Sequence, residues 1–150
     1  MKRTMLMPSN SGATSLRPVI RNVANSNGHV QGELKISIQY TRGEFHVMIQ
    51  HGRDLIAGGS SATSVSNTAT ELPSPNVKTY ILPGMHKITK RKTRIIRRNI
   101  HPTFMEMLVH RMSLENVQKR LLQVSAWSYD RVQENQFLGA VNIPLESLSR

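Results

Sequence analysis

The segment that decides the fold is residues 32–40, GELKISIQY. Leu34, Ile36, Ile38 and Tyr40 stand at every second position, with polar or charged residues between them. Such a period of two predicts a strand with one buried face and one exposed face. The fold is therefore expected to contain a sheet that covers an apolar core.

The next residues repeat the same pattern after a turn. Residues 41–43, TRG, supply the turn, and Phe45, Val47 and Ile49 then alternate with His, Met and Gln. Two alternating segments joined by a few turn residues predict a β-hairpin.

Further strands are expected along the rest of the chain. Residues 77–82 predict a third strand, which Pro83 and Gly84 end. In this strand Val77, Thr79 and Ile81 share one face, and Lys78, Tyr80 and Leu82 share the other. The remaining predicted strands are residues 92–97, 104–109, 121–127 and 137–144. Residues 113–120 predict a short helix with Ser113 as its N-cap. Short strands at this spacing indicate an all-β fold, an antiparallel sandwich or a barrel.

Two segments show no such periodicity. Residues 1–31 are rich in Ser, Asn and Gly and are expected to be a disordered or linker segment. Residues 56–75 are rich in Gly, Ser, Ala and Thr and predict a long loop. The folded domain is therefore expected to span residues 32–150.

Composition limits the class of protein. The chain has 150 residues, of which 38% are hydrophobic, which suits one domain with a modest core. The net charge of +11 predicts attraction to phosphates of lipids or nucleic acids. The chain has no cysteine, which excludes disulfides and Cys-based zinc sites, and it has no apolar run long enough to span a bilayer. These features favour a cytoplasmic or nuclear protein.

Positive charge is concentrated in residues 86–98, HKITKRKTRIIRR. No Asp or Glu occurs between Glu71 and Glu106, so no neighbour in the sequence neutralises this run. Because it lies between predicted strands, we expect it to form part of a folded surface that binds an anionic partner. The candidate contact residues are Lys78, Lys87, Lys90, Arg91, Lys92, Arg94, Arg97 and Arg98.

Strand alternation divides these cations between two faces. Some of Lys90, Lys92 and Arg94 are expected on one face, and Arg91 with Thr93 on the other. Three partners remain open: an acidic phospholipid surface, an acidic protein or importin that reads a nuclear localisation run, and nucleic acid. The cations can also simply keep the sheet soluble and guard an edge. Nucleic acid is the weakest of these, because no aromatic residue lies within the run for base stacking.

The order of these segments resembles a C2 domain over roughly residues 32–148. The resemblance is carried by RDL after the second strand, P-x-V-K-x-Y-x-L-P, K-R-K-T, N-x-H-P-T-F, and F-L-G after W-x-Y-D-R. Residues 77–109 are most similar to the C-terminal C2 domain of class II phosphoinositide 3-kinases. This implies a Greek-key antiparallel β-sandwich without catalytic activity. It further implies a role in membrane targeting, autoinhibition or nuclear import within such a kinase.

The chain departs from the C2 pattern in two places. C2 domains have eight strands, and the last is missing here, so we expect a truncated chain, a short isoform or a partial gene model. A sandwich without that strand would expose a sheet edge. The second departure is the loop at residues 56–75, which is longer than the family pattern.

The resemblance also bears on calcium, because calcium-binding C2 domains use about five carboxylates from two loops. The family's acidic positions fall on Ser74, Ser128, Asp130 and Gln136, while residues 56–73 hold only Glu71. Asp130 is the one carboxylate retained, and Glu134 lies nearby in the sequence. We therefore predict no metal site and no cofactor, and interpret Asp130 as a turn residue that bonds its own backbone.

Few other residues indicate chemistry. Trp127 is expected in the core, and Tyr129 and Arg131 in the following loop are candidates for lipid contact. No acid–base pair or nucleophile is apparent, and His46 and His51 lack ligand spacing. The sequence thus predicts a non-enzymatic module that binds acidic phospholipids without calcium. It is expected in the cytoplasm and peripherally at membranes, with the nucleus under the importin alternative.

Overall fold

The computed structural model describes residues 3–6, 17–21, 32–56, 72–83, 87–132 and 134–149. The first sheet consists of β1 (Arg3–Leu6), β2 (Arg17–Arg21), β3 (Glu33–Thr41), β4 (Glu44–Arg53) and β7 (Thr103–Arg111). The second sheet consists of β5 (Pro75–Leu82), β6 (Arg91–Lys92), β8 (Leu121–Ser128) and β9 (Gln136–Pro144).

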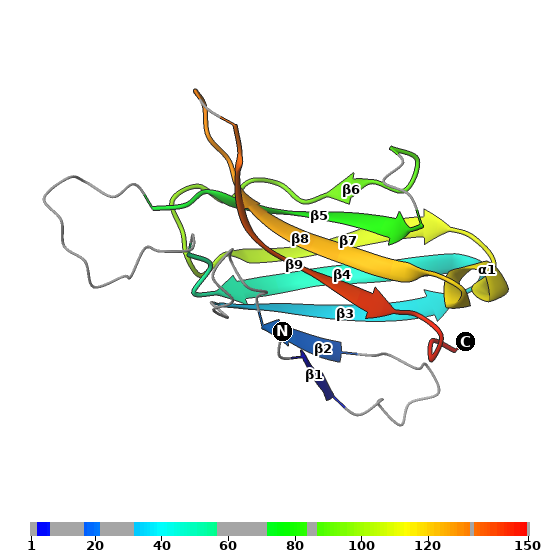
Figure 1. Cartoon of the computed structure of the whole chain (residues 1–150). Helices are drawn as coiled ribbons and strands as arrows, with labels where there is room; N and C mark the ends of the chain where they lie inside the picture. The colour runs from blue at the N-terminus through cyan, green and yellow to red at the C-terminus, as the bar shows by residue number, and fades with distance from the viewer. Residues whose placement is uncertain are drawn as a thin grey trace, which may run out of the picture.

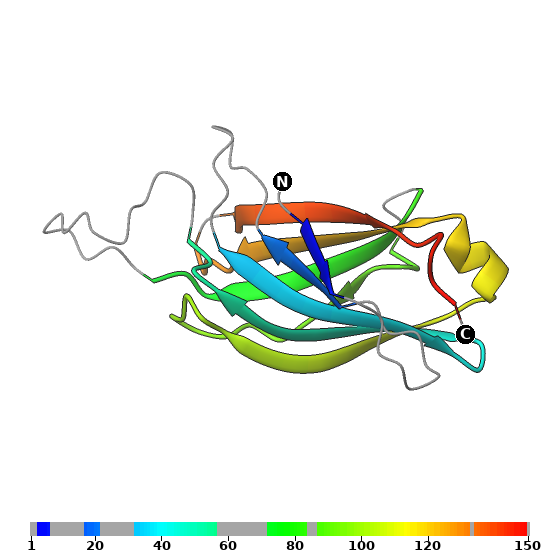
Figure 2. The same ribbon diagram turned by 90° about the horizontal axis from the view of Figure 1, so that it is seen from below.

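The two sheets pack as layers of an antiparallel β-sandwich (Figure 1). The strand order is β1-β2-β3-β4-β7 in the first sheet and β6-β5-β8-β9 in the second. Figure 2, seen from below, shows the two layers one above the other, with β9 and β8 of the second sheet over β4 and β7 of the first. The predicted all-β sandwich is confirmed.

The hairpin of β3 and β4 forms as the alternating pattern predicts. Thr41 pairs with Glu44, and the two turn residues Arg42 and Gly43 have φ of 48° and 81°. Positive φ at both central positions is the turn geometry that matches the twist of a hairpin, and glycine adopts it without strain.

The core lies between the two layers. The alternating residues of β3 and β4 are buried, as predicted, and Phe45 on β4 is fully buried with Phe104 on β7. Leu145 and Leu148 follow β9 and are also fully buried in the same cluster. The second sheet contributes Val77, Ile81, Leu122, Val124, Val141 and Ile143.

The fourth predicted strand, residues 92–97, is wrong in extent. The regular strand β6 contains only Arg91 and Lys92. After it, the buried hydroxyl of Thr93 accepts a hydrogen bond from the amide of Val77 at 2.9 Å. A side chain therefore takes the place of a ladder carbonyl, so the chain stays beside β5 without regular pairing.

The predicted helix is confirmed as α1 (Leu114–Gln118), which ends earlier than residue 120. The side chain of Ser113 accepts from the amide of Asn116, as expected of an N-cap. In the described ranges no helix is long and apolar enough to cross a membrane.

The structure differs from the sequence prediction in residues 1–31, which were expected to lack regular structure. Two parts of this segment form strands, β1 and β2. Val19 of β2 pairs with Lys35 of β3, so β2 lies along one end of β3. Most of the predicted long loop, residues 57–71, lies outside the described residues.

Candidate functional site

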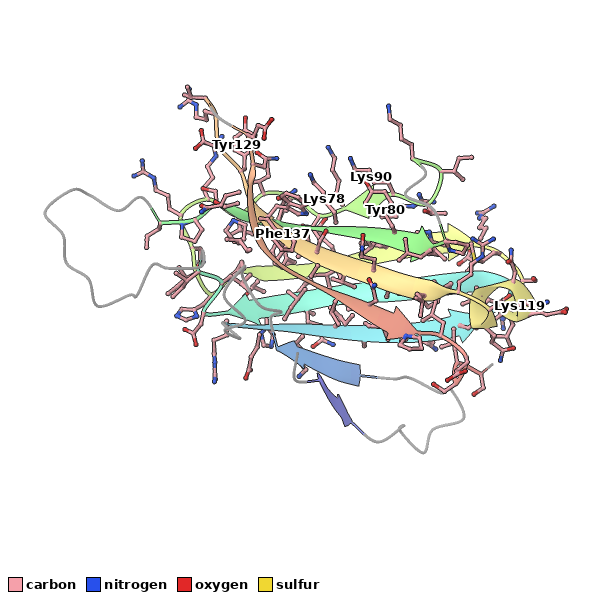
Figure 3. The ribbon with its side chains drawn as sticks, viewed as in Figure 1. Lys78, Tyr80, Lys90, Lys119, Tyr129 and Phe137 are labelled. Carbon is pink, nitrogen blue, oxygen red and sulfur yellow. The ribbon has the colours of Figure 1, made fainter. Side chains whose placement is uncertain are left out.

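The outer face of the second sheet carries a group of lysines. On β5, Val77, Thr79 and Ile81 are buried, which leaves Lys78 and Tyr80 on the outer face, as predicted. Lys78 pairs with Lys92 of β6. Lys78 and Lys90 point away from the sandwich on the same side (Figure 3). We define the basic face as Lys78, Tyr80, Lys90, Lys92, Trp127 and Phe137.

The lysines of the basic face are close enough to affect one another. Burial lowers the pKa of Lys78, and the charges of Lys90 and Lys92 lower it further. Like charges held together in this way repel, and an anion placed between them would relieve the repulsion. The basic face is therefore electrostatically suited to an anionic ligand.

Trp127 was expected in the core, and this prediction is wrong. Its ring lies on the outer face, where the Lys78 ammonium sits 4.8 Å from the ring centroid. Its Nε1 donates to the Ser125 hydroxyl at 2.9 Å, and Phe137 meets it edge-on with ring centroids 5.2 Å apart. The inward positions of β8 are Leu122, Val124 and Ala126, so alternation turns Trp127 outward.

Arg91 points the other way, as predicted from alternation. Its Nε donates to the Val109 carbonyl of β7 at 3.2 Å, and its Nη1 donates to the carbonyls of Ile88 and Lys90, each at 2.9 Å. Its guanidinium therefore ties the edge of the second sheet to the edge of the first.

Arg94 is also directed towards β7. Its Nη2 donates to the Thr103 carbonyl at 3.5 Å, and its backbone amide donates to the Glu106 carboxylate at 3.0 Å. Glu106 is twelve residues away in the sequence but lies beside the basic run in the fold. The sequence suggested that no acidic residue near the basic run offsets its positive charge. The structure instead places the Glu106 carboxylate beside the run.

The remaining predicted cations lie at the two ends of the second sheet. Lys87 is exposed in the connection that follows β5. Arg97 and Arg98 are exposed in a turn near the start of β5, where the Arg98 amide donates to the Ser74 hydroxyl at 3.2 Å. Of the eight candidates, Lys78, Lys90 and Lys92 share the basic face, two face β7, and three lie at the ends.

The side chains at the loop positions considered for calcium accept hydrogen bonds from backbone amides. The Ser128 hydroxyl accepts from the amide of Ser74 at 3.0 Å. The Asp130 Oδ1 accepts from the amide of Val132 at 2.8 Å, which confirms the interpretation of Asp130 as a turn residue. Within the described ranges, no three His, Cys, Asp or Glu side chains gather in a way that suits a metal ion.

Sequence reasoning missed the aromatic part of the basic face. The alternation of residues 77–82 predicts Tyr80 on the same face as Lys78, and this was the available signal. The alternation of β8, with Leu122, Val124 and Ala126 inward, was an equal signal for Trp127. Phe137 gave no such signal, because a register shift between Ala126 and Trp127 alters the pairing of β8 with β9. Such a β-bulge redirects side chains locally.

Comparison with known proteins identifies relatives of this chain. A family model described as C2 domain matches residues 43–150. The phosphatidylinositol 4-phosphate 3-kinase C2 domain-containing subunit alpha of Pongo abelii is 40% identical over 123 residues, which is 81% of this chain and 7% of that protein. Subunit beta of Homo sapiens is 38% identical over 144 residues, which is 94% of this chain and 8% of that protein. The chain therefore spans less than a tenth of the length of these relatives.

Solved structures agree with the fold. The crystal structure of a C2 domain of RIM from Drosophila matches with a TM-score of 0.67 at 22% identity, covering 78% of this chain and 88% of that one. With the family match and the two related subunits, this establishes that the chain belongs to the C2 domain family.

Proposed function

We propose that this C2 domain binds acidic phospholipid surfaces, and phosphoinositides in particular, through its basic face and without calcium. The observation that carries the proposal is the grouping of Lys78, Lys90 and Lys92 on one side of the second sheet. A phosphorylated inositol headgroup presents several anionic oxygens, which several ammonium groups can contact at once. Each cation near an anionic membrane contributes on the order of 1 kcal/mol.

The aromatic residues of the basic face support a membrane surface as the partner. Trp127 and Phe137 contact each other beside Lys78. Aromatic side chains with a polar group are favoured at the boundary between headgroups and acyl chains. The lysines beside these rings would be attracted to the anionic headgroups, while the rings would lie at the boundary with the acyl chains.

Calcium independence is supported by the residues of the loops. Ca²⁺ takes six to eight oxygen ligands, and charged carboxylates provide most of its affinity. Ser74 and Ser128 stand where the family pattern has acidic residues, and their hydroxyls bond backbone amides. We therefore propose that the lysines, rather than a bridging metal ion, make the contact with phosphate.

A C2 domain is a non-catalytic module, and this chain matches only a small part of its kinase relatives. We propose that it serves as a membrane-targeting module or a fragment of a class II phosphoinositide 3-kinase. Any kinase activity would then belong to parts of a parent protein beyond this chain. The expected location is the cytoplasm, peripherally at membranes.

An acidic protein partner or importin remains the alternative for the same face. A linear nuclear import signal needs an accessible segment, but Thr93 is buried and Arg91 is bonded to three carbonyls.

Nucleic acid binding needs open aromatic faces for base stacking. The ring of Trp127 is instead contacted by Lys78 and Phe137. Both observations favour the lipid surface.

Sedimentation with vesicles tests the proposal. Vesicles of phosphatidylcholine containing phosphatidylinositol bisphosphate are expected to bind the protein at low salt, with or without a calcium chelator. The double change Lys90→Ala and Lys92→Ala is expected to weaken binding by roughly 30-fold, from about 1 kcal/mol for each lysine.

Lys119→Ala is the matched control. Lys119 is an exposed lysine beyond the C-terminal end of α1, away from the basic face, and pairs with Glu115 at 3.5 Å (Figure 3). Its removal lowers net charge by the same unit as each test change but is expected to leave vesicle affinity nearly unchanged. Absence of vesicle binding at low salt, or equal losses in both proteins, would remove the proposal.

A further inference from the structure

Two exposed apolar residues lie at opposite ends of the second sheet. Ile88, in the connection between β5 and β6, is 85% exposed, and Val132, in the connection between β8 and β9, is 91% exposed. Pro75 at the start of β5 pairs with Ser128 at the end of β8, so the Val132 connection lies at the start of β5 and the Ile88 connection follows its end. An eight-residue strand separates them, about 23 Å at ~3.3 Å per residue.

Both connections rise on the same side of the sandwich. Figure 1 shows them projecting from the second sheet away from the first, at opposite ends of β5. Lys78, Lys90 and Tyr129 point to this side in Figure 3. The basic face therefore lies between two projecting connections, each of which carries an exposed apolar side chain.

Hydrogen bonds hold Ile88 in its exposed position. The amide of Lys90 donates to the Lys87 carbonyl at 3.2 Å, and the Thr89 hydroxyl accepts from the Ile81 amide at 3.3 Å. The Arg91 guanidinium donates to the carbonyl of Ile88 itself and also to Val109 of the other sheet. An exposed isoleucine is therefore presented by a braced turn.

The tip at Val132 is organised in a similar way. The Tyr129 amide donates to the Ser74 carbonyl at 2.9 Å, and the Asp130 side chain accepts from the amide of Val132. Arg131 precedes Val132, just as Lys87 precedes Ile88. An apolar side chain next to a cation matches the boundary of an anionic bilayer, where the charge meets phosphate and the apolar group enters the acyl region.

Building on the proposed function, we propose that the second sheet lies flat on the bilayer, with Ile88 and Val132 inserted at its two ends and the basic face over the headgroups between them. A single exposed apolar residue on a protein surface is ordinary and implies nothing. Two such residues, each beside a cation and each in a connection that projects on the lysine side of one sheet, fit a planar anionic surface. A soluble headgroup would contact only the lysines and leave both tips in water.

The absence of cysteine allows a site-specific test. Ile88→Cys, Val132→Cys and Met107→Cys proteins are each labelled with an environment-sensitive fluorophore. Met107 is the matched control, because it is an apolar residue, 45% exposed, on the outer side of the first sheet. Vesicles of phosphatidylcholine with phosphatidylinositol bisphosphate are expected to shift the emission at residues 88 and 132 to the blue and leave residue 107 unchanged.

A binding comparison separates this inference from the proposed function. Ile88→Ser is expected to weaken vesicle affinity by about 5- to 10-fold, the loss for an isoleucine side chain that is only partly transferred from water. Its affinity for inositol trisphosphate, the soluble headgroup, is expected to stay the same. An unchanged signal at residue 88 on vesicles that do bind the protein would overturn the flat orientation alone. Failure to bind either vesicles or inositol trisphosphate would overturn the proposed function and, with it, this inference.

Discussion

The guanidinium of Arg91 on β6 donates to the carbonyl of Val109 on β7, which joins the open edges of the two sheets. The same side chain serves the carbonyls of Ile88 and Lys90. Arg91, which the sequence suggested as a lipid contact, therefore has a structural role. Its side chain also covers the edge strand β7, and natural sheets protect such edges from further pairing.

Arg91→Ala is expected to lower the free energy of unfolding by about 1–2 kcal/mol, because partly buried carbonyls lose their donor. Lys92→Ala, at the neighbouring position, is expected to change it by less than about 0.5 kcal/mol, since that side chain is exposed. Urea unfolding followed by circular dichroism measures both values. Equal effects of the two changes would contradict the bridging role of Arg91.

Trp127 is the only tryptophan in the chain, so intrinsic fluorescence reports on the basic face directly. Binding of inositol trisphosphate is expected to change the emission of Trp127, because a phosphate of the ligand would bind the Lys78 ammonium that contacts the ring. Trp127→Leu is expected to weaken vesicle binding by about 3- to 10-fold, from the loss of a cation–π contact that positions Lys78. Emission that stays constant at saturating ligand would argue against Trp127 belonging to the site.

The pKa of Lys78 offers a test of the lysine cluster without any ligand. Lys92→Gln is expected to raise this pKa, because the removal of a neighbouring positive charge makes protonation of Lys78 easier. The value should stay below that of an ordinary lysine, since burial is the larger cause of the shift. Titration of the lysine side-chain carbon signals by NMR gives the change. No change would mean that the two ammonium groups are too far apart to interact.

His110 predicts a loss of stability in acid. It is buried beside Phe45, and burial together with the charge of Arg91 lowers its pKa to about 4. Between the unfolded value near 6.5 and about 4, the unfolded chain binds a proton that the folded protein does not. Stability is therefore expected to fall as pH decreases through this window, by on the order of 3 kcal/mol in total.

His110→Leu is expected to remove that part of the pH dependence, because it places a non-titrating apolar side chain of similar size in the core. Urea midpoints of both proteins at neutral pH and at about pH 4.5 isolate the effect of the histidine, because the carboxylates titrate in both proteins. Parallel losses of stability in the two proteins would rule out the histidine as the cause.

The sandwich was predictable because its strands carry strong local signals. The alternation in residues 32–40 and 45–49 matches the buried positions of β3 and β4, and the Ser113 cap begins α1 where expected. Residues 92–97 failed as a strand because the Thr93 side chain replaces a backbone partner, which depends on the neighbouring strand. Residues 1–31 have no period, so the pairing of β2 with β3 had no signal in the sequence.

Local sequence alone determined the alternating strands β3, β4 and β5, the hairpin turn, the helix cap and the position of the basic run, because each depends on residues a few positions apart. Tertiary structure alone decided which cations act together. Lys78 and Lys92 are fourteen positions apart and become neighbours only through the pairing of β5 with β6. Glu106 reaches Arg94, and Trp127 reaches Lys78, only when separate strands meet. Side-chain charge is a property of the sequence, but the distance between charges is a property of the fold.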